Sequence, residues 1–474
     1  MSKSKVIPAA EAGKLIKDGA TLYCSGVGLA GFAEEVAISI RERFEATGHP
    51  RDMTIWHACG LGNGKNKGIF HLTQPGMIKR IVGGHFGVGG PVLMQLIMDS
   101  RIEAYNLPQG VLVVLPREMA AGRPGLITKV GLETFVDPRI EGGKLNSATS
   151  EEIVERVDFD GQEWLFYRAP RIDVALIRGT TADENGNLTV EDEGIFNESI
   201  SIAQAAKRNG GIVIAQVLQV VQNGTLHPKQ VKVPGILVDH VVVGRPENHM
   251  QTMGTQYNRA FAGDIRVPVG SLRRLPLDER NGGIPADGLD FAHASNADAT
   301  IDPGYQFDFY DGGGLDVAFL GLAQTDVHGN VNVSKFSGRP VGCGGFINIT
   351  QNAKKVVFCG AFTAGGLEIR AADGRLEIVR EGTSRKFLDH VEQITFSGHY
   401  AAGVGQTVMY VTERAVFQLT REGGMELLEV APGVDIERDI LAHMDFVPRM
   451  ERVREMDAGI FSERWGRLYE ILHS

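Results

Sequence analysis

The sequence has little cysteine and no long apolar run, and each shortage argues against a class of protein. Its 474 residues contain four cysteines, Cys24, Cys59, Cys343 and Cys359, and no C-x-x-C pair. A disulfide framework and a structural zinc site therefore have no support, and we expect free thiols. No run reaches the roughly 18 apolar residues that span a bilayer, and the N-terminus lacks the apolar core of a signal peptide. We expect a soluble, cytoplasmic protein in a reducing compartment.

Positively charged residues are also outnumbered by negatively charged ones. There are 48 Lys and Arg residues against 58 Asp and Glu residues, so the net charge is −10 and a nucleic-acid partner gains no electrostatic support. The sequence has no G-x-S-x-G, G-x-x-x-x-G-K-[ST] or H-E-x-x-H motif. Serine hydrolases, P-loop NTPases and zincins are therefore not indicated.

Glycine is abundant instead, with 60 residues and no triplet period, which excludes collagen. Short apolar runs bounded by Gly, Pro or Asp alternate with segments of helical spacing at 32–44 and 197–208. This alternation predicts an α/β fold with mainly parallel, buried strands. The predicted strands are 110–115, 174–177, 212–215, 241–243, 317–320 and 356–358.

An internal repeat divides the chain. Residues 173–190 align without gaps on 316–333, with seven identical pairs, and each copy reads strand, D-x-x-G-N turn, strand. The chain is thus predicted to hold two related open α/β halves. A strand-turn-helix unit at 20–37 precedes the first copy, whereas a much shorter stretch precedes the second. The second half is therefore predicted to be shortened at its start.

Glycine clusters mark candidate ligand sites. The turn at 25–28 follows a predicted strand and precedes a helix, where backbone N–H groups can hold an anion or an oxyanion. Residues 26–31 fit G-x-G-x-x-G, but the acidic residue expected about 20 residues on lacks a strand context. Three further clusters, at 282–288, 311–316 and 342–347, indicate either left-handed turns or a groove at strand ends; their number favours the groove.

Several histidines lie in suggestive places. His57 and His85 are candidate ligands or bases, although a hydrogen-bonded structural histidine is the favoured interpretation. The same interpretation covers His293, His328 and His399.

Taken in order, these segments resemble the family I CoA-transferases, specifically the long single-chain acetate/propionate and 3-oxoacid type with fused α-like and β-like halves. The resemblance implies an α-like half at 1–245 and a β-like half at 246–474, shortened near 278–281. The matching segments are 25–36, 133–139, 142–146, 177–187, 210–217, 233–239, 266–272, 282–291, 306–316, 329–336, 342–350 and 358–369.

The resemblance implies transfer of CoA from a short-chain acyl-CoA to a carboxylate such as acetate or a 3-oxoacid. A glutamate attacks the thioester to form an anhydride, CoA returns to form a glutamyl-CoA thioester, and the acceptor opens it. CoA is then a substrate, and no metal or tightly bound cofactor is required. A homo-oligomer, dimer or tetramer, is expected, with no nucleic-acid or membrane partner.

Site residues carry over by position. The implied oxyanion hole is Ser25, Gly26, Val27 and Gly28. The implied CoA contacts are Gly282, Gly283, Pro285, Gly288, Phe291, Gly342, Gly344, Gly345 and Phe346. Arg339 is either a partner for a CoA phosphate or a solvated surface arginine.

The nucleophile is the one departure. The family glutamate stands in an E-x-G element five residues before a Gly-Gly pair, and Leu277 occupies that position here. Either a segment is missing from this sequence, or the gene has a true deletion, or Glu279 is a substitute nucleophile. We favour a missing segment, because loss of a core strand costs more than the about 5–15 kcal/mol by which a domain is stable. A non-catalytic acyl-CoA-binding protein and an acyl-CoA hydrolase remain alternatives.

Overall fold

The computed structural model describes residues 4–268, 284–465, 467 and 470. It divides into two compact units. Unit 1 comprises Met1–Val130, Val136–Asp308 and Gly338–Gly345, and unit 2 comprises Gly131–Phe135, Phe309–Ser337 and Phe346–Ser474. The predicted boundary after residue 245 thus falls inside unit 1. The reason is local, because the chain beyond residue 245 packs on the unit 1 sheet, where Arg178 donates to the Met250 carbonyl.

Unit 1 is built on a seven-stranded sheet in which every neighbouring pair is parallel, in the order β13-β11-β8-β1-β2-β3-β4. This confirms the predicted α/β class. The strands are β1 (Thr21–Cys24), β2 (Met53–His57), β3 (Ile78–Gly83), β4 (Glu103–Asn106), β8 (Val174–Arg178), β11 (Ile212–Val217) and β13 (His240–Val243).

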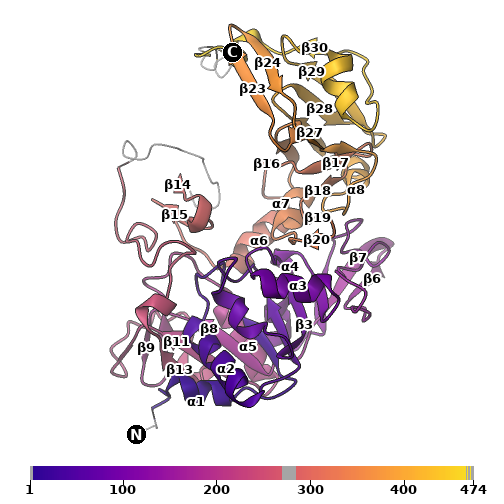
Figure 1. Ribbon diagram of the computed structural model, residues 1–474. Coiled ribbons are helices and arrows are strands. Elements are labelled where there is room, and N and C mark those ends of the chain that lie inside the picture. Colours follow the sequence, from indigo (N-terminus) through magenta and orange to yellow (C-terminus); the bar gives the residue numbers. More distant parts are fainter. Residues whose placement is uncertain (1–3, 269–283, 466, 468–469, 471–474) are drawn as a thin grey trace. The chain divides into compact units, whose positions relative to one another are not determined.

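Helices cover both faces of this sheet, as alternation along β1 shows. Leu22 and Cys24 belong to one core cluster with side chains of α1 (Ala9–Lys14), α2 (Glu34–Thr47) and α3 (Pro91–Met98). Tyr23 points to the other face, where its hydroxyl donates to the Leu112 carbonyl of α4 (Gln109–Ala120). There α4 packs against α5 (Ser199–Arg208) (Figure 1). A parallel strand buried on both faces reads as a near-continuous apolar run, as residues 174–177 of β8 do.

The strand predicted at 110–115 is wrong, because these residues lie in α4. All six are buried, and a continuous apolar run fits a helix enclosed by its neighbours as well as it fits a strand. The other five predicted strands are confirmed as β8, β11, β13, β16 (Val317–Gly321) and β21 (Lys355–Cys359). The two predicted helices are confirmed as α2 and α5.

Unit 2 carries a six-stranded sheet in the order β16-β21-β27-β28-β29-β30. Its first three strands are parallel, and β27, β28 and β29 continue as an antiparallel meander. The remaining strands of this sheet are β27 (Thr407–Val411), β28 (Ala415–Leu419), β29 (Met425–Val430) and β30 (Arg454–Glu455). Phe362, Phe387 and Phe417 form the centre of its core, with ring centroids 4.6 Å and 5.0 Å apart for the pairs that include Phe387.

Smaller elements complete both units. In unit 1 they are β5 (Gly125–Thr128), β6 (Val154–Phe159), β7 (Gln162–Arg168), β9 (Thr181–Asp183), β10 (Leu188–Thr189), β12 (Gln219–Val221), β14 (Ile284–Pro285), β15 (Ala294–Ser295) and β20 (Arg339–Pro340). In unit 2 they are β17 (Gln324–Asp326), β18 (Val331–Asn332), β19 (Lys335–Phe336), β22 (Thr363–Ala364), β23 (Glu368–Ala372), β24 (Arg375–Arg380), β25 (Ser384–Arg385), β26 (Phe387–Leu388), α7 (Phe346–Gln351) and α8 (Gly398–Gly403). Helix α6 (Pro303–Asp311) spans the division between the units.

The internal repeat is a repeat of structure. Val174 of β8 pairs with Ile212 of β11, and the equivalent Val317 of β16 pairs with Lys355 of β21. In both units a three-stranded sheet follows, β10-β9-β12 or β18-β17-β26. This confirms two related α/β halves with mainly parallel sheets.

The aspartate of each D-x-x-G-N turn organises that turn in the same way. The Asp183 carboxylate accepts from the backbone N–H and the side-chain amide of Asn187, at 2.9 Å and 2.7 Å. The Asp326 carboxylate accepts the same two bonds from Asn330, each at 3.0 Å. Both aspartates are buried, so the turns depend on these bonds.

No helix among the described residues is both long and apolar enough to cross a membrane. The described residues, which include all four cysteines, contain no disulfide bond.

We expect Asp183→Ala and Asp326→Ala each to lower the free energy of unfolding by about 2–4 kcal/mol, because each leaves buried amide donors without their charged acceptor. Urea unfolding followed by circular dichroism measures both. Asp298→Ala removes an exposed aspartate and serves as the control, with an effect within about 0.5 kcal/mol. A loss below about 1 kcal/mol in both turn variants would show that the turns do not depend on the carboxylates.

Candidate functional site

The candidate site lies at the carboxyl ends of β1 and β8. These two strands are neighbours, yet the chain leaves β1 toward β2, β3 and β4 and later leaves β8 toward β11 and β13. In an open parallel sheet, the point where the strand order reverses leaves a crevice that binds ligands. The predicted oxyanion turn at 25–28 directly follows β1, so the structure places it at this point.

Three of the four backbone amides of residues 25–28 donate hydrogen bonds to carbonyl groups outside these four residues. The N–H of Ser25 donates to the Leu176 carbonyl, that of Val27 to the Ala30 carbonyl, and that of Gly28 to the Gly60 carbonyl, at 3.1, 2.9 and 2.7 Å. Among the residues that the structure describes, Gly26 N–H has no acceptor. Of the four predicted oxyanion-hole residues, Gly26 is therefore the one whose amide has no acceptor in the described part of the chain, and its binding of a ligand oxygen stays a prediction.

Glycine is required at this turn for steric reasons. Gly26 has φ +133°, and a Cβ there would lie 2.8 Å from the Ala30 carbonyl oxygen. Gly28 has φ +62°, and a Cβ there would lie 2.6 Å from Cγ of Met253. Met253 thus covers the turn closely, and a side chain at position 28 would require both a strained φ and a shift of Met253.

A buried ion pair fixes the segments around the turn. Nε and Nη2 of Arg178, at the end of β8, donate to the two carboxylate oxygens of Glu193 at 2.8 Å and 2.5 Å. Nη1 of Arg178 donates to the Leu29 carbonyl, and Nη2 to that of Met250, so one guanidinium joins the chain after β1 to the segment that carries Met253. Burial alone would raise the pKa of Glu193, but the charge of Arg178 outweighs it and holds that pKa well below its usual range.

The sequence patterns did not single out this ion pair. The available signal is a charged residue at the end of an otherwise apolar strand, V-A-L-I-R at 174–178. A charge in that place is rarely buried unless it is paired.

Three of the predicted CoA contacts lie on one hairpin. Pro285 belongs to β14, which pairs with β15, and Gly288 and Phe291 lie in the connection between them. The hairpin attaches to the segment that covers the oxyanion turn, since Thr252 Oγ1 donates to Asp290 Oδ1 at 2.5 Å. Phe291 and the neighbouring Leu289 are exposed. Leu289 also lies against Gly254, the chain neighbour of Met253, so exposed apolar side chains are attached to the segment that covers the turn.

The second group of predicted CoA contacts is divided. Gly342 and Gly344 are seated in unit 1, where Gly344 N–H donates to the Gly84 carbonyl at 2.7 Å. A Cβ on Gly342 would lie 2.6 Å from the His85 Cα, so close backbone packing explains this glycine. Phe346, which follows Gly345, packs in the core of unit 2 with its ring 5.8 Å from that of Phe358. Whether these residues contact CoA stays a prediction.

The remaining predicted site residues are away from the turn or beyond the described part of the chain. Arg339 is exposed on β20. Leu277, Glu279, Gly282 and Gly283 lie outside the described residues.

His57 fits the structural interpretation. Its Nδ1 lies 2.6 Å from the Cys59 carbonyl oxygen and its ring packs edge-on against Phe86. Burial lowers its pKa to about 4, so the ring is neutral at physiological pH. The described residues contain no cluster of three His, Cys, Asp or Glu side chains arranged to hold a metal ion.

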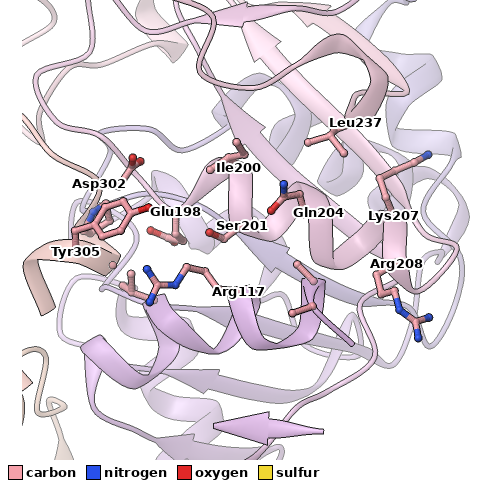
Figure 2. A pocket seen from close by; sticks show the side chains of 15 residues that line it. Arg117, Glu198, Ile200, Ser201, Gln204, Lys207, Arg208, Leu237, Asp302 and Tyr305 are labelled. Carbon is pink, nitrogen blue, oxygen red and sulfur yellow. The ribbon is translucent and has the colours of Figure 1, made fainter. Parts of the chain in front are cut away.

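A separate cavity of about 810 Å³ lies between α4 and α5 (Figure 2). Arg117, Glu198, Ser201, Gln204 and Tyr305 are among its lining residues. Arg117 is already paired with Asp308 at 3.0 Å. Glu198 is buried, and within the described chain its Oε1 has no hydrogen-bond partner. Burial raises the pKa of Glu198 to about 7, a property that no sequence pattern had indicated.

Comparison with known proteins gives consistent matches. Residues 6–244 match the family described as coenzyme A transferase. The chain is 46% identical to caffeate CoA-transferase of Acetobacterium woodii, with 99% of each chain covered. It is 40% identical to acetate CoA-transferase YdiF of Escherichia coli (strain K12), with 96% of this chain and 95% of YdiF covered.

Two crystal structures of acyl-CoA transferase YdiF from Escherichia coli O157:H7 match at 40% identity, each with a TM-score of 0.89. The match to the apoenzyme covers 98% of this chain and 97% of the YdiF chain. The match to the thioester complex with CoA covers 97% of this chain and 96% of the YdiF chain.

The alignments also show that many positions of the relatives have no counterpart in this chain. The match to the caffeate CoA-transferase runs over 524 positions, which exceeds the 474 residues of this chain by 50. At least that many positions of the relative have no counterpart here. The match to YdiF likewise runs over 507 positions while covering 96% of this chain. Such a deficit is what the predicted shortening of the second half requires.

We expect Gly26→Ala to lower the free energy of unfolding by about 2–4 kcal/mol, because it combines a strained φ with a clash against backbone. Gly64→Ala is the matched control: Gly64 has φ +74° but nothing within 4 Å of the position that a methyl group would take, so only the conformational cost of about 1 kcal/mol applies. Thermal and urea unfolding compare the two. Equal losses would show that the turn is not as tightly enclosed as described.

We expect Glu198→Gln to stabilise the protein at high pH. The folded-state pKa is raised above the roughly 4.3 of an unfolded glutamate, so the wild type loses stability as pH rises from about 4.3 to 7. The amide does not ionise, so its advantage should reach about 3–4 kcal/mol at pH 8 and fall to about 1 kcal/mol at pH 5. Urea unfolding at both pH values tests this, with the exposed Glu11→Gln as control. A difference in unfolding free energy between Glu198→Gln and the wild type that does not change with pH would contradict this expectation.

Proposed function

This chain belongs to the coenzyme A transferase family, and from that membership we propose that it transfers CoA from a short-chain acyl-CoA to a carboxylate through a glutamyl-CoA thioester. It is an enzyme that moves CoA between an acyl thioester and a carboxylate, as its full-length relatives are. The observation that carries the covalent route is the 0.89 TM-score to a relative crystallised as a thioester complex with CoA.

The proposed route exchanges one bond at a time. A glutamate oxygen attacks the acyl thioester carbonyl, the C–S bond breaks, and CoA leaves as a thiolate with an anhydride behind it. The thiolate attacks the glutamyl carbonyl, which releases the first carboxylate and forms the glutamyl thioester. The acceptor carboxylate then reverses both steps. These bonds need only the enzyme's carboxylate and the two substrates, so CoA is a substrate and no tightly bound cofactor is needed.

Each attack places negative charge on a carbonyl oxygen, and the turn after β1 offers a donor for it. The Gly26 N–H is the turn amide that the described part of the protein leaves without an acceptor, and its direction is held by the bonds of Ser25, Val27 and Gly28. A donor fixed before the reaction does not need to reorganise as the charge develops, which is the condition for strong oxyanion stabilisation. This supports the role proposed for residues 25–28.

We place the nucleophilic glutamate in the segment that the relatives have and this sequence lacks. Leu277 occupies the family position, and the alignment with the caffeate CoA-transferase exceeds this chain by 50 positions. Glu279 stays a weaker candidate because it matches the family motif neither in position nor in its neighbours.

The finer features are proposals of the same kind. The exposed Phe291 and Leu289, on a hairpin joined to the segment that covers the turn, support a CoA contact at residues 284–295. We propose a cytoplasmic location, and the family implies a homo-oligomer, a dimer or tetramer, and a short acyl group. The acceptor is a carboxylate of the acetate or 3-oxoacid kind.

A second candidate is a protein that binds acyl-CoA without transferring it. The deficit of 50 aligned positions favours it, because a chain that truly lacks the segment lacks the family nucleophile. Such a protein would bind CoA and form no covalent adduct.

The intact mass of the protein from its natural source, before and after acetyl-CoA, distinguishes the two. We expect a mass above 51.3 kDa by about fifty residues, and after acetyl-CoA a further gain of one CoA that hydroxylamine removes. A mass of 51.3 kDa with no adduct would contradict the transferase proposal and support the binding protein.

A labelled acceptor completes the test. Transfer requires that labelled acetate or 3-oxoacid becomes its CoA thioester. Release of free acid with no labelled thioester would instead identify an acyl-CoA hydrolase, in which water opens the anhydride.

A further inference from the structure

The cavity between α4 and α5 is separate from the oxyanion turn, because no residue of 25–28 is among those that line it. All of its lining residues belong to unit 1, and its volume of about 810 Å³ suits a small-molecule ligand. Part of the lining is apolar and can bury a hydrocarbon chain. The apolar lining residues are Val113, Ala120, Ala121, Ile200, Leu237 and Pro303.

One end of the cavity is acidic, since Glu198, the N-cap residue of α5, and Asp302 both line it there (Figure 2). The Glu198 side chain is 5% exposed, and its Oε1 has no hydrogen-bond partner among the residues that the structure describes. A buried carboxylate is stable only with a hydrogen-bond donor or a cation beside it. The cavity is the space from which a ligand can supply that group.

The other end of the cavity is basic, since Lys207 and Arg208 of the last turn of α5 lie there (Figure 2). Lys207 is paired with Asp239 at 2.7 Å, whereas Arg208 has no ion-pair partner in the described part of the chain. Gln204 lies one helical turn before Arg208, and its side-chain amide has no partner there either. These two side chains can therefore bind one anionic group together.

The two ends are held apart by one helix. The backbones of residues 198 and 208 are separated by roughly 15 Å along the axis of α5. Arg117 also lines the cavity, but Asp308 balances its charge at 3.0 Å. A ligand that satisfies both ends therefore carries a cation and an anion at opposite ends of an extended chain.

We propose that this cavity binds an extended ω-amino carboxylate. Its ammonium group contacts Glu198 and Asp302, its carboxylate contacts Gln204 and Arg208, and its methylene chain lies along the apolar lining. No residue of the oxyanion turn takes part, so this site goes beyond the proposed function, and either can fail without the other.

The probe is 8-aminooctanoate, and isothermal titration calorimetry at pH 8 measures its binding to the 474-residue chain and to the protein from its natural source. We expect saturable binding to both. Octanoate and octylamine each keep one charged end, so each should bind about tenfold more weakly or worse. 4-Aminobutyrate carries both charges but is too short to reach both ends, and it should be weaker by a similar factor.

Variants at each end locate the binding. Glu198→Gln removes the negative charge and should weaken probe binding about tenfold or more at pH 8. This variant is expected to be more stable than the wild type at that pH, so the loss would not come from unfolding. Arg208→Gln should weaken binding about threefold, because the Arg208 charge is exposed. The exposed Glu11→Gln and Arg101→Gln are the matched controls and should stay within about twofold.

The affinity should rise with pH. The ammonium group requires an ionised Glu198, and burial raises the pKa of Glu198 to about 7. Affinity for the wild type should therefore increase about tenfold from pH 6 to pH 8, in proportion to the ionised fraction, and Glu198→Gln should show no such increase. The charged and titratable groups around Glu198 are Arg117 of α4, Lys207 and Arg208 of α5, Asp302 and Tyr305 near the start of α6, and Tyr23 and Cys24 of β1.

Four results would overturn the proposal. The first is no saturable binding of 8-aminooctanoate, and the second is binding of octanoate as tight as that of the probe. The third is an affinity that falls from pH 6 to pH 8, which would place the ligand's carboxylate, not its ammonium, beside a protonated Glu198. The fourth is binding by the 474-residue chain that the natural protein lacks, which would show that the additional segment fills the cavity.

Discussion

The pairing of β1 with β8 is the contact on which the candidate site depends. It joins the first strand of the chain to one more than a hundred residues later, and it creates the point where the strand order reverses. The Ser25 amide bonds the Leu176 carbonyl at the end of this pair, so the oxyanion turn begins where the two strands separate. Without β1 beside β8, the strand order would not reverse at this point and the crevice would be lost.

The Arg178–Glu193 pair makes the crevice rigid at a cost in desolvation. Both side chains are almost completely buried, and an ion pair in that setting stabilises little unless its remaining donors are satisfied. Here the spare donors of Arg178 reach carbonyls on both sides of the turn. The ion pair positions the chain more than it stabilises the fold, since it holds Leu29 and Met250 at fixed positions around Gly26.

Much of this architecture could be predicted from the sequence. The repeat at 173–190 and 316–333 indicated two related halves, and the apolar runs indicated most of their central strands. The run at 110–115 was misassigned because periodicity is uninformative when every side of an element is buried. Arg178, Glu193 and Glu198 escaped notice because their roles come from burial, and burial depends on contacts between segments far apart in sequence. The turn at 25–28 was located correctly, but only the hydrogen-bond pattern separates Gly26 from its three neighbours.

Among the described residues, β16 pairs with a strand on its β21 side alone, and its Phe319 is exposed, which has a consequence for the 474-residue chain in solution. An apolar edge strand with open amides and carbonyls is a template on which identical strands of other molecules can add. The 474-residue chain should therefore be prone to aggregate at the concentrations used for crystallisation and to engage chaperones during synthesis. The solubility of the purified chain would then indicate whether the second sheet is complete. Solubility can be measured before any assay of CoA chemistry.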